Sequence, residues 1–122
     1  MDMEKYTKAA NILFNCRLNK IRLDKLPIDC IPKNIEEAYK IQDELKILYL
    51  TLKDNYTIGK KVGCTNKLAQ KQINVEEPFY GNLFSKYSAL SGCKLKSNNF
   101  SKPYMEPEFS FRIKEDINIA NA

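Results

Sequence analysis

The strongest constraint on the fold of this chain is a change in apolar periodicity near residue 55. Before it, apolar residues recur at helical spacing over 4–18 and over 35–53, with Pro27 and Pro32 between the two segments. After it, glycines and prolines divide the chain into short segments typical of strands and turns. The chain is therefore predicted to be α+β, with N-terminal helices followed by a mixed, strand-rich region.

Local signals predict where these elements begin and end. Asn34 is the expected N-cap of the second helix, and together with Glu37 three residues later it resembles a capping box. A third, short helix is predicted over 66–73. Extended segments are predicted at 56–63, 83–84, 93–96 and 105–113.

The length and hydropathy of the chain limit its class. Its 122 residues, 43% of them hydrophobic, suffice for one core, and we expect a single partial domain that is helical over 1–55 and strand-rich over 56–122. No apolar run approaches the roughly 20 residues that span a bilayer. The segment Met1–Lys5 leads into an amphipathic pattern without the hydrophobic core of an export signal. The sequence predicts a cytoplasmic protein with no membrane partner.

The positive charge is carried mainly by scattered lysines. The formal net charge is +5, yet only Arg17, Arg22 and Arg112 are arginines, and the longest basic run is Lys60–Lys61. Nucleic-acid recognition relies on forked arginine contacts and on clustered charge. The sequence therefore argues against a nucleic-acid partner.

Two residue types narrow the possible chemistry. The chain has no histidine, which excludes an imidazole base and an imidazole metal ligand within it. The four cysteines are too widely spaced for a C-x-x-C redox motif or a zinc site. Acid and base chemistry would fall to lysine, glutamate, aspartate or tyrosine.

Residues 105–113 alternate polar and apolar side chains, so Glu106 and Glu108 are predicted to lie on the same face of a strand. Two such carboxylates can lean onto one ion, and oxygen ligands favour Mg²⁺ or Mn²⁺ over zinc. The alternative interpretation is that both glutamates form the solvated face of an amphipathic strand.

Five short motifs follow one another along the chain. They are Glu37–Gln42, Gly59–Thr65, Gln70–Val75, Pro78–Leu83 and Pro103–Glu108. They match the patterns A-Y-x-I/V/L-Q, G-x-K-I/V-G-x-T, Q-x-Q-x-G-V, P-x-x-G-x-L and P-x-x-E-x-E. In this order and spacing the chain resembles the N-terminal half of the 2-keto-4-pentenoate hydratase family, within the fumarylacetoacetate hydrolase superfamily. The resemblance implies a truncated fold of that superfamily's type.

The resemblance also implies an activity. Members of the family that the chain resembles are metal-dependent lyases. They act on 2-oxo acids through a metal-stabilised enolate, with Mg²⁺ or Mn²⁺ held by carboxylates. On this basis Glu106 and Glu108 are two of three metal ligands, and Lys61 is a catalytic residue that orients substrate or shuttles protons. Because Gly59 and Gly63 flank Lys61, we expect close approach of the ligand and partial burial, which would lower the pKa of Lys61. Tyr39 and Gln42 are expected to serve packing and local hydrogen bonding.

The chain departs from the family pattern at two positions. Phe79 stands where hydratases of the family commonly have an aspartate for acid–base work. A 2-oxo-3-enedioate decarboxylase of the 4-oxalocrotonate type is therefore an alternative to a hydratase. Asn74 replaces a common glycine, and asparagine accepts the left-handed backbone better than most residues.

The third departure is length, since the third metal carboxylate of the family lies beyond the part that this chain resembles. A homo-oligomer, or a chain supplying the missing half, is therefore an expected partner beside the small-molecule 2-oxo acid. The alternative from another functional class is a non-catalytic truncated remnant or interaction module.

Overall fold

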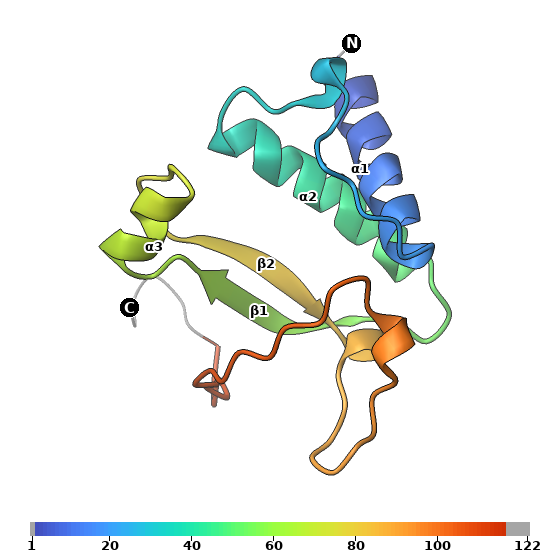
Figure 1. The fold of residues 1–122 in the computed structure, drawn as a ribbon, viewed down its shortest axis with the longest axis vertical. Coiled ribbons are helices and arrows are strands. Elements are labelled where there is room, and N and C mark those ends of the chain that lie inside the picture. Colours follow the sequence, from blue (N-terminus) through green and yellow to red (C-terminus); the bar gives the residue numbers. More distant parts are fainter. Residues whose placement is uncertain (1, 117–122) are drawn as a thin grey trace.

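The computed structural model describes residues 2–116 and confirms the α+β class. The helices are α1 (Asp2–Leu18), α2 (Ile35–Leu50) and α3 (Lys67–Gln72), the strands are β1 (Thr57–Gly63) and β2 (Phe79–Phe84), and short 3₁₀ turns lie at Ile28–Cys30, Ser85–Tyr87 and Ser97–Asn99. Figure 1 shows α1 and α2 packed together on the side of β2, while the chain after β2 returns past β1 on the other side. Within the described residues, no helix is long and apolar enough to cross a membrane.

The predicted N-cap of α2 is confirmed. Asn34 accepts a hydrogen bond from the Glu37 N–H at 2.9 Å. The return bond of the capping box is displaced by one residue, because Glu37 Oε2 accepts from the Lys33 N–H at 2.8 Å. The same carboxylate oxygen receives Lys5 Nζ from α1 at 2.8 Å, so the start of α2 is also tied to the neighbouring helix.

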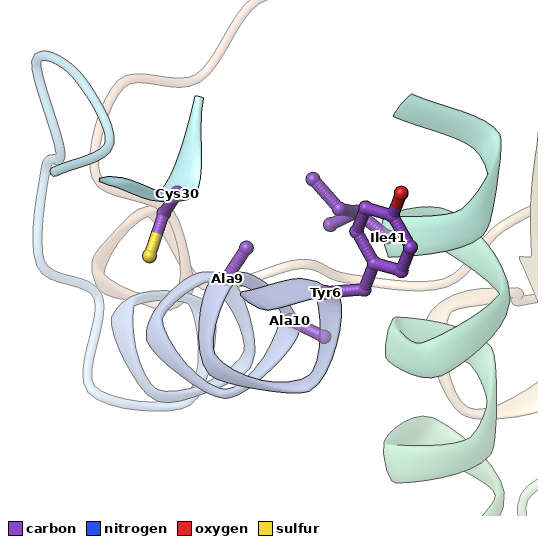
Figure 2. Close-up of a cluster of buried hydrophobic side chains, with 5 residues drawn as sticks. All are labelled: Tyr6, Ala9, Ala10, Cys30 and Ile41. Atoms are coloured by element: carbon purple, nitrogen blue, oxygen red, sulfur yellow. The ribbon is translucent and has the colours of Figure 1, made fainter. Parts of the chain in front are cut away.

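The hydrophobic core is small and lies mainly between the two long helices. Figure 2 shows Tyr6 of α1 against Ile41 of α2, with Ala9, Ala10 and Cys30 completing the buried cluster. Both alanines are fully buried, and their short side chains allow close approach to α1. Partly buried apolar residues surround this cluster, namely Ile12, Leu13, Leu26, Leu45 and Leu48.

β1 and β2 form a two-stranded antiparallel sheet, although α3 lies between them in the sequence. Asn66 caps α3 by accepting a hydrogen bond from the Ala69 N–H at 2.9 Å. The turn after α3 places Asn74 at a φ of 57°, which confirms the left-handed backbone expected for this position.

Two predicted strands do not form. Residues 93–96 and 105–113 carry no β pairing, so the strand-rich region of the described chain is reduced to β1 and β2. A strand is stabilised by hydrogen bonds to a neighbour and by packing of one face, and 105–113 has neither. Phe109 and Phe111, the apolar half of the alternating pattern, are 96% and 89% exposed. The alternation was therefore real in the sequence, but within residues 2–116 no strand pairs with this segment.

An aromatic cluster joins the helices to the sheet. The Tyr49 ring of α2 contacts Phe14 of α1 and Phe84 of β2, with centroid separations of 5.2 and 4.7 Å. It also meets Tyr87 edge-on at 5.8 Å. Burial raises the pKa of the Tyr49 hydroxyl. Pairs of this geometry add to the free energy gained by burying the rings themselves.

Asn55 reinforces the same joint through hydrogen bonds. This buried side chain donates to the Tyr49 carbonyl at 2.8 Å and accepts from the Lys86 N–H at 3.1 Å. Its amide therefore links the end of α2 to the 3₁₀ turn that follows β2.

We expect Asn55→Ala to lower the free energy of unfolding by about 1–3 kcal/mol, because the buried Asn55 amide makes hydrogen bonds to the Tyr49 carbonyl and to the Lys86 N–H that alanine cannot make. Urea unfolding followed by circular dichroism measures the change. Asn15→Ala is the matched control: it removes the same side chain from an exposed position of α1 and should change stability by less than about 0.5 kcal/mol. Equal effects of the two substitutions would show that the joint is unimportant.

Candidate active site

The three residues predicted to form a site come together in the structure. Lys61 lies in β1 opposite Gly81 of β2. Its Nζ donates a hydrogen bond to Glu108 Oε1 at 2.5 Å and lies 4.0 Å from Glu106 Oε2. Although 105–113 is not a strand, the two carboxylates still face the same cation, as the alternation of residues 106 and 108 predicted.

The electrostatic state of Lys61 differs from the sequence expectation. The hydrogen bond from Lys61 to Glu108 holds the pKa of the lysine above its usual value, and this outweighs the opposite effect of desolvation. The negative charges of Glu108 and Glu106 act in the same direction as the hydrogen bond. The expected lowering by burial is therefore wrong for this arrangement, since the Lys61 side chain is 47% exposed and has acidic partners. Lys61 is a charged ammonium at neutral pH.

The donor set around Lys61 fits a hard divalent cation. Glu106 and Glu108 offer carboxylate oxygens, which Mg²⁺ and Mn²⁺ prefer, and both already flank one positive charge. Among the residues that the structure describes, no group of three or more acidic or cysteine side chains converges on one point. Two carboxylates leave most of an octahedral coordination shell to water or substrate oxygens.

A shallow pocket of about 350 Å³ adjoins Lys61. Its lining consists of Gln42, Lys61, Gly63, Phe79, Tyr80, Gly81, Asn82 and Leu83. This volume is within the range of small-molecule sites. The pocket combines aromatic surface with one cation and two side-chain amides, a combination that suits a small anion with an apolar part.

Helix α2 holds the wall of this pocket in place. Gln42 donates to the Tyr80 carbonyl at 2.9 Å, and Tyr39 accepts from the Tyr80 N–H at 3.2 Å while its ring stacks on the Tyr80 ring at 4.8 Å. The prediction of a packing and hydrogen-bonding role for Tyr39 and Gln42 is confirmed. Both bonds reach across to β2, because the first motif and the fourth motif of the sequence pack against each other.

Asn82 is a pocket residue that the sequence did not single out. It donates to Gln42 Oε1 at 3.3 Å and accepts from Lys60 Nζ at 2.6 Å. Its place between Gly81 and Leu83 in the P-x-x-G-x-L motif was the available signal.

Gly63 and Phe79 are paired in the sheet at the edge of the pocket. A Cβ atom added to Gly63 would lie 3.1 Å from the Phe79 ring, closer than ordinary van der Waals contact. The absence of a side chain at Gly63 therefore lets the ring of Phe79 lie over the backbone and form part of the pocket wall.

Comparison with known proteins gives a consistent set of relatives. The chain is 26% identical over 110 residues to the TodF product hydratase of Pseudomonas putida, covering 90% of this chain and 41% of the relative. It is 29% identical over 84 residues to the 2-keto-4-pentenoate hydratase of Paraburkholderia xenovorans, covering 69% of this chain and 31% of the relative. The chain is related to the 2-keto-4-pentenoate hydratase family.

A further relative carries a different activity in its name. The 4-oxalocrotonate decarboxylase of a Pseudomonas species is 27% identical over 103 residues, which cover 84% of this chain and 39% of that enzyme. The chain thus spans less than half the length of each of these relatives. No family model and no solved structure gives a significant match.

We expect Gly63→Ala to destabilise the protein by about 1 kcal/mol, because the new methyl group must push the Phe79 ring aside. Thermal and urea unfolding measure the loss. Gly81→Ala is the control in the neighbouring strand, where a Cβ would meet nothing within 4 Å, and it should be neutral or slightly stabilising because alanine restricts the unfolded chain. The interpretation of Gly63 fails if the two variants are equally stable.

Proposed function

We propose that this chain contributes the metal and lysine part of a lyase site of the 2-keto-4-pentenoate hydratase type, acting on 2-oxo acids. The observation that supports this most strongly is the convergence of Lys61, Glu106 and Glu108 beside a pocket. The fumarylacetoacetate hydrolase type of fold belongs to the same proposal, and so does a single partial domain that is helical over 1–55 and begins the catalytic region over 56–122. The third carboxylate ligand would come from chain beyond the described residues or from a partner.

In this proposal Glu106 and Glu108 would hold Mg²⁺ or Mn²⁺. When bound, the cation supplies electrostatic stabilisation of negative charge on the oxygen atoms of a 2-oxo acid. Lys61 binds and orients the substrate carboxylate as a charged ammonium, and its Nζ can deliver a proton to the substrate carbon chain. Lys61 is protonated in this arrangement and has no free lone pair to act as a base, so the abstracted proton would go to another group.

Phe79 favours a second candidate, a decarboxylase of the 4-oxalocrotonate type. Decarboxylation leaves carbon dioxide as the departing group and needs no residue to activate an attacking water, whereas hydration does. The ring of Phe79 stands in the pocket wall where hydratases of the family commonly have an aspartate. The pocket residues include no acidic side chain that could replace it.

The metal proposal predicts opposite effects on Mn²⁺ affinity when a site glutamate and the site lysine are replaced. We expect Glu106→Gln to weaken Mn²⁺ binding by about tenfold or more, because half of the carboxylate donors are changed to amides. We expect Lys61→Met to tighten binding of Mn²⁺ alone by up to about fivefold, because the ammonium group competes with the cation for the same carboxylate oxygens. Isothermal titration and water-proton relaxation measure both changes.

Two controls separate the local site from overall charge. Lys60→Met removes a lysine charge from the preceding position of β1, where Nζ donates to Asn82, and should leave Mn²⁺ affinity unchanged. Glu77→Gln removes a glutamate charge from an exposed position outside the site and should also leave Mn²⁺ affinity unchanged. Oxalate, added as an analogue of a 2-oxo acid, should bind the Mn²⁺-loaded protein less well after Lys61→Met. Equal responses of sites and controls would contradict the metal proposal.

The two candidate reactions are distinguished at Phe79. We expect a site of the decarboxylase type to release carbon dioxide from 4-oxalocrotonate faster than it hydrates 2-keto-4-pentenoate, and a site of the hydratase type to show the opposite ratio. Phe79→Asp should shift this ratio toward hydration, because a carboxylate beside the pocket can activate water. Leu68→Asp adds the same charge to an exposed position of α3 and is the control.

Carbon dioxide release and loss of the dienol absorbance measure the two rates. If the chain turns over neither substrate, either alone or with a completing segment, the enzymatic proposal is contradicted. A non-catalytic interaction module is then supported.

A further inference from the structure

A second pocket lies on another part of the molecule, between the end of α1 and the segment around the last 3₁₀ turn. Its volume is about 330 Å³, and its lining consists of Cys16, Arg17, Lys20, Ile21, Arg22, Leu23, Asn99, Phe100, Ser101 and Lys102. None of these residues belongs to the candidate active site. The pocket joins parts of the chain that are about 80 residues apart in the sequence.

The charge of this pocket is one-sided. Four of its lining residues are cationic, namely Arg17, Lys20, Arg22 and Lys102, and none is acidic. Two of the three arginines of the chain are therefore gathered at one point, although the basic residues are scattered in the sequence. Asp24 contacts Arg22 at 3.3 Å, but both side chains are largely exposed, and such a pair is weak enough to be opened by a ligand.

Lys20 links the two sides of the pocket, because its backbone ends the α1 segment and its side chain reaches the segment near residue 98. Lys20 closes α1 with a φ of 56°, a conformation that favours glycine, and the Ile21 N–H donates back to the Cys16 carbonyl at 2.8 Å. Lys20 Nζ reaches across to the Asn98 carbonyl at 2.7 Å. This bond uses one of the three ammonium donors and leaves the others for a ligand.

The remaining lining residues indicate the size and kind of ligand. Ser101 adds a hydroxyl donor, and Phe100 adds an aromatic surface that is 40% exposed. Forked guanidinium groups match the oxygen atoms of phosphate and carboxylate groups. A polymeric nucleic acid would need a basic track beyond one pocket, whereas a small anion needs only this cluster.

We propose that this pocket binds a small, multiply charged oxyanion, such as a phosphate-bearing or polycarboxylate metabolite, independently of the candidate active site. The ligand would lie between Arg17 and Arg22 on one side and Lys102 on the other. Its binding would fix the segment 99–102 against α1.

Titration with inorganic pyrophosphate and with citrate, followed by isothermal calorimetry and by amide NMR shifts, tests the proposal. The double variant Arg22→Gln with Lys102→Gln should weaken binding by about tenfold or more, because two charge-assisted contacts are lost. Arg17 and Lys20 are left intact, since Arg17 also lies 5.3 Å from the Tyr87 ring and Lys20 shapes the backbone. Preference for pyrophosphate or citrate assigns the ligand to phosphates or carboxylates.

The control removes the same charge from two exposed lysines outside the pocket, Lys53→Gln with Lys94→Gln. It should change either affinity by less than about twofold, because these exposed charges lie outside the pocket lining and are screened by solvent and salt. Circular dichroism establishes that both double variants remain folded. Absence of binding at millimolar anion, equal weakening in the control, or binding of a single-stranded oligonucleotide without binding of either small anion would overturn the proposal.

Discussion

The packing of Tyr49 of α2 against α1 and β2 is the contact on which the rest of the structure depends. The buried core lies mainly between α1 and α2, and the two-stranded sheet alone would be too small to be stable. The Tyr49 ring contacts Phe14 and Phe84 at the same time. The Asn55 side chain makes hydrogen bonds to the Tyr49 carbonyl at the end of α2 and to the Lys86 N–H after β2. The sheet is therefore ordered because it is attached to the helices at this end.

The candidate active site is held firmly on one side and loosely on the other. Tyr39 and Gln42 attach β2 to α2, and the ladder then places Lys61 on β1. By contrast, Glu106 and Glu108 lie on an exposed segment whose described contact with Lys61 is between partly exposed charges, which contributes little stability. Under the proposed function, a cation bound to these glutamates would restrain this side of the site.

Much of the helical part followed from local patterns, because a helix satisfies its own backbone and needs only a cap and an apolar stripe. Asn34 and Asn74 are where they were expected to be for the same local reason. The strands behaved differently. The alternation in 105–113 predicted which residues share a side, but it carried no information about whether a pairing strand is present. That is why the two carboxylates lie toward the same lysine, as their spacing predicted, while the predicted strand over 105–113 does not form.

The sequence by itself determined the α+β class, the helix boundaries to within a few residues, the family relationship and the pairing of Glu106 with Glu108, because all of these depend on spacing along the chain. Only the tertiary structure decided what lies opposite those carboxylates, that Lys61 keeps a raised pKa, and that scattered cations gather at a second pocket. These properties depend on distances between residues far apart in sequence. Packing sets such distances, and local periodicity carries no record of them.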